Sequence, residues 1–160
     1  MIERQNCNMK YFIYFSETGN GDVVADYLKE KDFQIIKIEM KKKLAKSFFF
    51  KMMQGGFLAS IHAKSKINDL DLNLNMDDEV VIGSPIWNAR LASPINTILK
   101  KYEFVRPSFV LYSGSGTAKA AIKYLNKNYP NSKVIILKEP KKYAEELNKL
   151  SLLENENGQN

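Results

Sequence analysis

The chain has 160 residues, a length that suits one domain with a single hydrophobic core. Hydrophobic residues make up 44% and charged residues 26%, the balance of an ordinary globular protein rather than a disordered one. Its one cysteine, Cys7, excludes an internal disulfide, and with His62 as the one histidine no metal-ligand spacing is present. No apolar run approaches the roughly 20 residues of a membrane span, and no apolar signal core opens the sequence, so we expect a cytoplasmic protein.

The net charge of +6 comes largely from one lysine-rich stretch, residues 40–68, which has no acidic residue. Such a patch can bind nucleic acid, an anionic membrane surface or an acidic partner protein, although many are only a solvated face. No nucleic-acid motif accompanies it, so we expect no nucleic-acid partner.

The first predicted element is a buried strand, indicated by an apolar run at residues 11–15. It leads into a polar loop at residues 16–22, Ser-Glu-Thr-Gly-Asn-Gly-Asp, and then into a helical pattern with apolar positions 23, 24, 27 and 28. Glycines let such a loop curl so that its N–H groups point inward, and the helix start adds positive partial charge. The loop therefore suits a phosphate group; the alternative is a plain strand-to-helix turn capped by Asp22.

No lysine or arginine lies in this loop, so a phosphate bound there would be held by neutral donors. This excludes a P-loop, which needs a lysine on the phosphates. The loop is not a dinucleotide fingerprint either, because Val24 stands where the third glycine of that motif belongs.

The next elements continue the alternation of strands and helices. Residues 33–40 alternate apolar and charged side chains, which predicts a half-exposed strand at a sheet edge. Residues 41–75 predict a variable helical segment that breaks at Gly55-Gly56. Its aromatic and basic mixture fits either a helix on a membrane surface or a helix covering the sheet, with lysine stems over its margin.

The second half of the chain repeats the strand–loop–helix pattern. A strand at 79–83 precedes a loop at 84–91 and a helix that starts with Ser93 as N-cap and Pro94 in the first turn. A strand at 109–112 and a loop at 113–116 precede a helix around 118–125. The last strand, 134–137, precedes a final helix opened by Pro140.

Five strands with helices between them predict an α/β fold: a doubly wound three-layer sandwich with a five-stranded parallel sheet. If 33–40 is an edge, the order is 2-1-3-4-5. We expect one domain at residues 9–150, an N-terminal extension at 1–8 and a disordered tail at 151–160. Ligands of such sheets bind beyond the carboxyl ends of the strands at the switch point, here beside the loops at 16–22 and 84–91.

These loops resemble the flavodoxin family. Ser-Glu-Thr-Gly-Asn-Gly at 16–21 is similar to that family's phosphate loop, and Gly-Ser-Pro-Ile-Trp at 83–87 is similar to its G-x-P-x-W segment. Flavodoxins are themselves the known case of this strand order with flavin at the switch point. The resemblance implies bound FMN. The cofactor-binding residues it implies are Ser16, Glu17, Thr18, Gly19, Asn20, Gly21, Ser84, Pro85, Ile86, Trp87, Asn88, Ser113, Gly114, Ser115 and Gly116.

The resemblance also implies individual roles. Trp87 would stack on the flavin ring, the alternative being a tryptophan that fills the core edge. Asn88 stands where several flavodoxins have a glycine whose peptide turns over on reduction; Asn tolerates the required positive φ next best after Gly. Gly21 replaces a Thr or Ser, which loses one hydroxyl donor to phosphate. Tyr112 either stacks on the flavin or points into the core.

Three functions follow as hypotheses. The first is a low-molecular-weight FMN electron carrier whose redox partner, given the basic chain, has an acidic surface. The second is an NAD(P)H-dependent FMN reductase acting on quinones, with the segment 41–66 as a wall and Arg90 meeting a phosphate. The third is a flavin-free interaction module. A receiver domain is excluded, because the strand at 79–83 ends in Gly-Ser-Pro without the aspartate to be phosphorylated.

Overall fold

A computed structural model describes residues 8–41 and 66–154 of the chain. Its centre is a sheet with the order β2 (Gln34–Lys37), β1 (Lys10–Tyr14), β3 (Glu79–Trp87), β5 (Ser108–Ser113) and β6 (Val134–Lys138). Neighbouring strands on this path are parallel, and the short β4 (Arg90–Leu91) pairs antiparallel with the end of β3. With β4 set aside, this is the predicted order 2-1-3-4-5, so the predicted fold class is confirmed.

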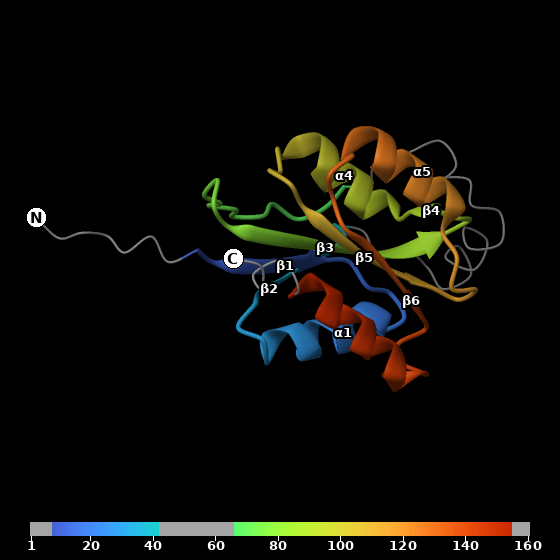
Figure 1. Cartoon of the computed structure of the whole chain (residues 1–160). Helices are drawn as coiled ribbons and strands as arrows, with labels where there is room; N and C mark the ends of the chain where they lie inside the picture. The colour runs from blue at the N-terminus through green and yellow to red at the C-terminus, as the bar shows by residue number, and fades with distance from the viewer. Residues whose placement is uncertain (1–7, 42–65, 155–160) are drawn as a thin grey trace, which may run out of the picture.

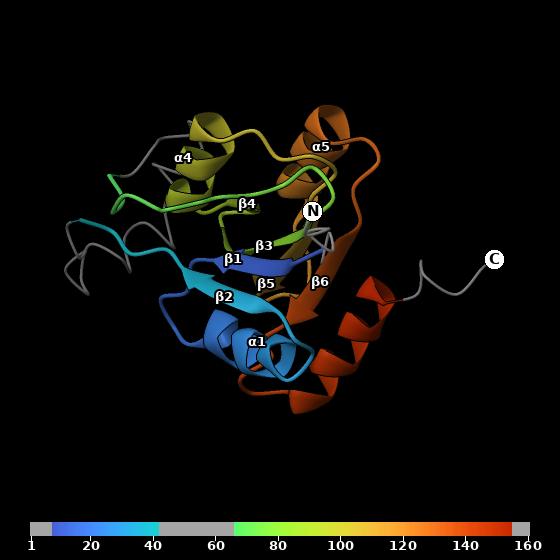
Figure 2. The same cartoon turned by 90° about the vertical axis from the view of Figure 1, so that its left-hand side faces the viewer.

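Helices cover both faces of the sheet (Figure 1, Figure 2). On one face, α4 (Ser93–Lys101) and α5 (Lys119–Asn128) close a core that includes Ile95 and Leu125. On the other face, α1 (Asn20–Lys29) and the 3₁₀ helix η1 (Ala144–Leu153) close a second core. The sheet is therefore the middle layer of three.

Strand residues alternate between these two cores, which explains why the central strands are apolar at every position. In β1, Ile13 packs in the core under α4 and α5, whereas Phe12 packs in the core over α1 and η1; both are 0% exposed. The edge strand β6 follows the same rule, because Ile136 packs toward the first core and Leu137 toward the second. Helices on both sides therefore account for an apolar edge strand.

The opposite edge, β2, has half-exposed and exposed residues, as its alternating pattern predicts. Beyond it, residues 66–75 form no helix. Ile67 pairs with Met40 in an isolated antiparallel bridge, and the half-buried Leu70, Leu72 and Leu74 pack against the core. The helical prediction for 41–75 is therefore wrong for 66–75, where alternate leucines favour an extended chain; residues 42–65 lie outside the described part.

Several predicted element boundaries differ from the observed ones. Ala92, not Ser93, is the N-cap of α4, and Ser93 is its first residue. Pro140 lies in a turn after β6 rather than opening a helix. The final helix η1 extends into the stretch predicted as a tail, because Leu153 is buried against the second core.

This packing predicts that η1 is required for stability. Leu150 is 1% exposed, so Leu150→Ala should lower the free energy of unfolding by about 2–4 kcal/mol through lost burial and a residual cavity. The matched control is Leu152→Ala on the same helix, because Leu152 is 50% exposed and its loss should change stability by less than about 0.5 kcal/mol. Urea unfolding of the three proteins measures both effects, and equal stabilities would contradict the assigned packing of η1.

Candidate functional site

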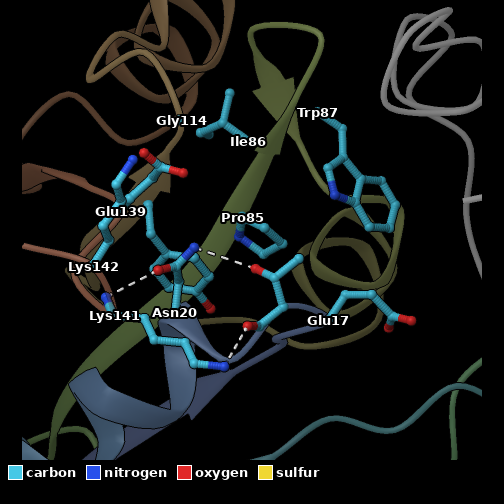
Figure 3. Close-up of a pocket in the computed structure, with 11 residues that line it drawn as sticks. Glu17, Asn20, Pro85, Ile86, Trp87, Gly114, Glu139, Lys141 and Lys142 are labelled. Atoms are coloured by element: carbon cyan, nitrogen blue, oxygen red, sulfur yellow. Dashed lines mark hydrogen bonds between the residues drawn. The ribbon is translucent and has the colours of Figure 1, made fainter. Parts of the chain in front are cut away.

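A pocket of about 420 Å³ opens at the carboxyl ends of the central strands (Figure 3). The loop after β1, the end of β3 and the loop after β5 meet there, and the turn after β6 closes one side. Its lining residues are Glu17, Thr18, Asn20, Pro85, Ile86, Trp87, Tyr112, Gly114, Glu139, Lys141 and Lys142. The pocket thus lies at the switch point predicted from the strand order, between β1 and β3.

The loop between β1 and α1 ends on a left-handed glycine. Gly19 is the N-cap of α1 with φ 91°, a conformation that side chains disfavour, and its carbonyl accepts the helical hydrogen bond of Val23 N–H at 3.3 Å. Asn20 then begins the helix beside the pocket, and its side-chain amide donates to Thr18 Oγ1 at 3.2 Å. The loop therefore presents the positive end of α1 to the pocket. Asp22 lies in the first turn and does not cap the helix.

Two of the predicted loop residues support the loop from below instead of lining the pocket. Ser16 is buried, and its Oγ accepts a hydrogen bond from Gly21 N–H at 3.0 Å. The Gly21 amide therefore points to Ser16 and not to the pocket. Within the described residues, no hydrogen bond to another group occupies the amides of Thr18, Gly19 and Asn20, so these N–H groups are not used by the fold itself.

Gly21 leaves room for Tyr112, the last but one residue of β5. The Tyr112 hydroxyl donates to the carbonyl of Phe15, and burial raises the pKa of this phenol well above its ordinary value. A Cβ built on Gly21 would lie 2.5 Å from the Tyr112 oxygen and 2.8 Å from Ser16 Cβ. Tyr112 is thus a buried support under the loop, with one part of its ring in the pocket wall, and the glycine at position 21 is a packing requirement.

An apolar wall comes from the end of β3. The sequence predicts that this strand stops at 83 and that 84–91 is a loop, but β3 continues to Trp87 and turns through Asn88 and Ala89 into β4. Pro85 and Ile86 are half-buried and face the pocket. Ser84 is 0% exposed; its Oγ donates to the Pro85 carbonyl and accepts from Ala92 N–H.

Trp87 lies at the boundary of pocket and core. It is 2% exposed, and its ring packs edge-on against Phe15 with the centroids 5.9 Å apart. Figure 3 shows the indole among the residues that line the pocket. The ring therefore fills the core edge and contributes a small part of its surface to the wall; stacking on a flavin stays a prediction.

The loop after β5 forms the third side. Gly114 lines the pocket, and a Cβ built on it would meet no atom within 4 Å, so a side chain at this position would enter open space. Ser113 is buried and donates to the Thr117 carbonyl at 2.8 Å, and Ser115 hydrogen-bonds Thr117 Oγ1 at 2.9 Å. Gly116 takes a left-handed φ of 75°. These bonds shape the loop and leave Gly114 as its contact with the pocket.

Of the fifteen predicted site residues, seven line the pocket; they come from the loop after β1, the start of α1, the end of β3 and the loop after β5. The predicted cofactor-binding residues that line the pocket are Glu17, Thr18, Asn20, Pro85, Ile86, Trp87 and Gly114. Those that lie behind it or beside it are Ser16, Gly19, Gly21, Ser84, Asn88, Ser113, Ser115 and Gly116. No ligand contact tests these assignments, which stay predictions.

Three pocket residues were missed by the sequence reasoning: Glu139, Lys141 and Lys142. They form the turn after β6, which Glu139 begins in a left-handed conformation with φ 38°. The strand order carried a usable signal, because the loop after the last strand leaves the same edge of a parallel sheet as the other three loops.

An ion pair lies under the other side of the loop. The Asp22 carboxylate accepts hydrogen bonds from Lys37 Nζ and from the Tyr14 hydroxyl, both at 2.8 Å, which ties α1 to β2 and β1. Partial burial raises the pKa of Asp22, but the bonds from Lys37 and Tyr14 outweigh it and hold that pKa below its usual value. Burial, with the bond to Asp22, raises the pKa of Tyr14.

Residues 8–41 and 66–154 include no group of three or more His, Cys, Asp or Glu that could hold a metal ion. Over the same residues, no helix is long and apolar enough to cross a membrane.

The Gly21–Tyr112 contact predicts a reversal of the usual helix preference. Gly→Ala in a helix ordinarily stabilises by up to about 1 kcal/mol, but Gly21→Ala should destabilise by about 1–3 kcal/mol because the new methyl overlaps Tyr112 and Ser16. Tyr112→Phe removes the closest atom, so it should be less damaging in the Gly21→Ala background than in the wild type. A double-mutant cycle by urea unfolding measures this coupling, and additive effects would contradict the contact.

The lowered Asp22 pKa predicts a pH-dependent contribution to stability. A carboxylate whose folded pKa is depressed stabilises the fold above its unfolded pKa and loses this effect as the pH falls through the folded pKa. Because the pair is partly exposed, Asp22→Asn should cost no more than about 1 kcal/mol at neutral pH. The difference from wild type should shrink below about pH 4. Measuring the free energy of unfolding at several pH values tests this prediction, with Asp26→Asn on the same helix as the control. A stability difference between Asp22→Asn and wild type that does not change with pH would contradict this mechanism.

Comparison with known proteins gives structural matches only. No protein-family profile and no curated protein matches the sequence. Among solved structures, a flavoprotein from Lactobacillus acidophilus NCFM, crystallised in complex with FMN, superimposes with a TM-score of 0.63 at 18% identity, over 86% of this chain and 97% of that chain.

Two proteins named as flavoproteins from Bacteroides species give similar agreement. The one from Bacteroides eggerthii DSM 20697 has a TM-score of 0.67 at 21% identity, over 85% of this chain and 94% of the other. The one from Bacteroides uniformis ATCC 8492 has a TM-score of 0.63 at 22% identity, over 81% of this chain and 90% of the other. With the strand order and the pocket at its switch point, these matches show that the chain has the flavodoxin-like fold of these flavoproteins.

Proposed function

We propose that the chain binds FMN and acts as a small flavodoxin-like electron carrier. The observation that carries this proposal is that a single pocket joins the start of α1, with its hydroxyl-bearing loop, to the apolar residues Pro85 and Ile86. A phosphate group and a flat aromatic ring need these two environments, and the lining of the pocket contains both.

The residues present fit FMN on their chemistry. Among the polar groups of the lining, the Thr18 hydroxyl, the Asn20 side chain and the amides at the start of α1 are donors suited to phosphate. Among the apolar groups, Pro85 and Ile86 offer contact area for a ring, and Gly114 lets the backbone approach a ring closely. The FMN complex of the Lactobacillus acidophilus protein, which shares the fold, supports the same choice of cofactor.

FMN, when bound, supplies the redox chemistry, since it accepts and donates one or two electrons. The protein's share is binding and orientation. The loop at 16–21 and the start of α1 would hold the phosphate, while Pro85, Ile86 and Gly114 would exclude water from one side of the ring. The buried Tyr112, held by its bond to the Phe15 carbonyl, keeps the loop and β5 in fixed relation.

The positive charge of the chain supports the further proposal that its redox partner has an acidic surface. The net charge is +6, and Lys138, Lys141 and Lys142 follow one another around the turn beside the pocket. A positive field steers and orients an acidic partner protein. The reductase hypothesis relied on Arg90 and a lysine-rich wall; residues 42–65 of that wall lie outside the described part, and turnover of NAD(P)H with a quinone is the measurement that separates the two functions. A cytoplasmic location stays a prediction.

The first experiment is a visible spectrum of the purified protein before and after incubation with FMN and removal of the excess. Retained flavin absorbance, with quenching of the fluorescence of Trp87, the only tryptophan, would support the proposal. A colourless protein that does not retain FMN would favour the flavin-free interaction module. Steady turnover of NAD(P)H with a quinone would favour the reductase over the carrier.

Gly114 gives a variant that should block the pocket without disturbing the fold. A Cβ at this position meets no atom within 4 Å, and φ is not left-handed, so Gly114→Leu should leave the melting temperature nearly unchanged. Because Gly114 is part of the pocket wall, a leucine there should narrow the space for a ring, and FMN affinity should fall by tenfold or more, roughly the effect of 1.4 kcal/mol. Gly114→Ala is the matched control, with a smaller loss. Unchanged FMN affinity in Gly114→Leu would place the flavin elsewhere.

A further inference from the structure

The turn after β6 places a lysine over the predicted phosphate loop. Lys141 Nζ donates to the Thr18 carbonyl at a long 3.4 Å, and Lys141 N–H donates to Asn20 Oδ1 at 3.1 Å (Figure 3). Its side chain also passes close to Gly19: a Cβ built there would lie 3.1 Å from Lys141 Nζ. A residue 123 positions away in the sequence thus supplies the cation that the loop itself lacks.

The main chain of this turn is held in place by several bonds. Glu139 N–H donates to the Ser113 carbonyl at 3.2 Å, and the Glu139 carbonyl accepts from Lys142 N–H at 2.8 Å and Tyr143 N–H at 2.9 Å. Glu139 adopts a φ of 38° just before Pro140. Strained backbone of this kind persists only where the surroundings fix it, and it is commonly found at ligand sites. Lys141 is therefore presented by a defined turn and not by a loose surface chain.

Local charge around the loop favours a role for this cation. The loop's own ionisable side chains, Glu17 and Asp22, are acidic and would repel a phosphate. Asp22 already has Lys37 at 2.8 Å, whereas the described residues give Lys141 Nζ only the Thr18 carbonyl. Lys141 also helps to lower the pKa of Asp22, so its charge acts across the loop.

Resting on the proposed function, we propose that Lys141 binds the phosphate of the flavin and makes the site select FMN over riboflavin. The loop itself offers a phosphate only neutral donors, because it has no Lys or Arg. Lys141 adds a stronger, charge-assisted donor to them. This positive charge is supplied by the turn after β6 and not by the phosphate loop itself.

The alternative is that Lys141 only fastens the turn to the loop through the Thr18 carbonyl and Asn20. The two roles predict different ligand dependence. A fastening role affects FMN and riboflavin equally, since both need the loop in place. A phosphate contact affects FMN alone, and it weakens as salt screens the charge.

The test compares dissociation constants of FMN and riboflavin for wild type, Lys141→Gln and Lys141→Arg, measured by flavin fluorescence at low and high salt. Lys141 is exposed, and its backbone bond to Asn20 survives substitution, so the variants should fold. Lys142→Gln is the matched control: it removes the same charge from the next residue, whose Nζ lies 5.2 Å from the Tyr143 ring.

For Lys141→Gln we expect FMN binding about tenfold weaker or more, with riboflavin binding unchanged and the salt dependence of FMN binding reduced. Lys141→Arg should stay near wild type, and Lys142→Gln should have a much smaller effect. Equal losses for FMN and riboflavin, or equal losses in Lys141→Gln and Lys142→Gln, would overturn the phosphate contact while leaving flavin binding in place. A wild type that binds neither flavin would overturn the proposed function itself, and this inference with it.

Discussion

The site depends on how closely the end of β5 approaches the loop after β1. Tyr112 reaches under this loop and donates to the Phe15 carbonyl, and the contact is possible because Gly21 has no side chain. Ser16 completes the support by accepting from the Gly21 amide. These groups are nearly inaccessible to water, so the position of the loop is set by packing rather than by a ligand. A pocket that is formed in advance binds with less loss of conformational entropy than one that must be ordered.

This arrangement shows what a short motif can and cannot predict. The strand order followed from apolar runs, the alternating pattern at residues 33–40 and the spacing of helices, because buried parallel strands impose that composition. The three loops at the pocket followed from the strand order. The need for glycine at position 21 could not be predicted, because it comes from contact with Tyr112, a residue 91 positions away. The sequence alone does not show whether the Tyr112 side chain points into the core or into the pocket.

The other differences have physical causes of the same kind. The sequence at 84–87 looks like a loop because it begins with serine and proline, yet β5 pairs with it through Ser84 and Pro85 and extends the strand. Lys141 is near the loop because β6 ends at the same edge of the sheet, and the prediction that Pro140 opens a helix left out the turn that is found there. Boundaries set by long-range pairing are thus less predictable than elements set by local periodicity.

The hairpin after β3 sets a limit on movement in the pocket wall. Asn88 and Ala89 both have left-handed φ values, 49° and 61°, which match a two-residue turn between paired Trp87 and Arg90. A left-handed alanine costs about 1–2 kcal/mol.

The Ala89 carbonyl accepts from Ala121 N–H at 2.8 Å, which gives a partner to an amide in the first turn of α5. Because that carbonyl is held by α5, a rotation in this turn is confined to the peptide between Asn88 and Ala89, which carries the Asn88 carbonyl. The flavodoxin resemblance implies a peptide that turns over at this position, so the chain can make such a movement only by keeping Ala89 and α5 where they are.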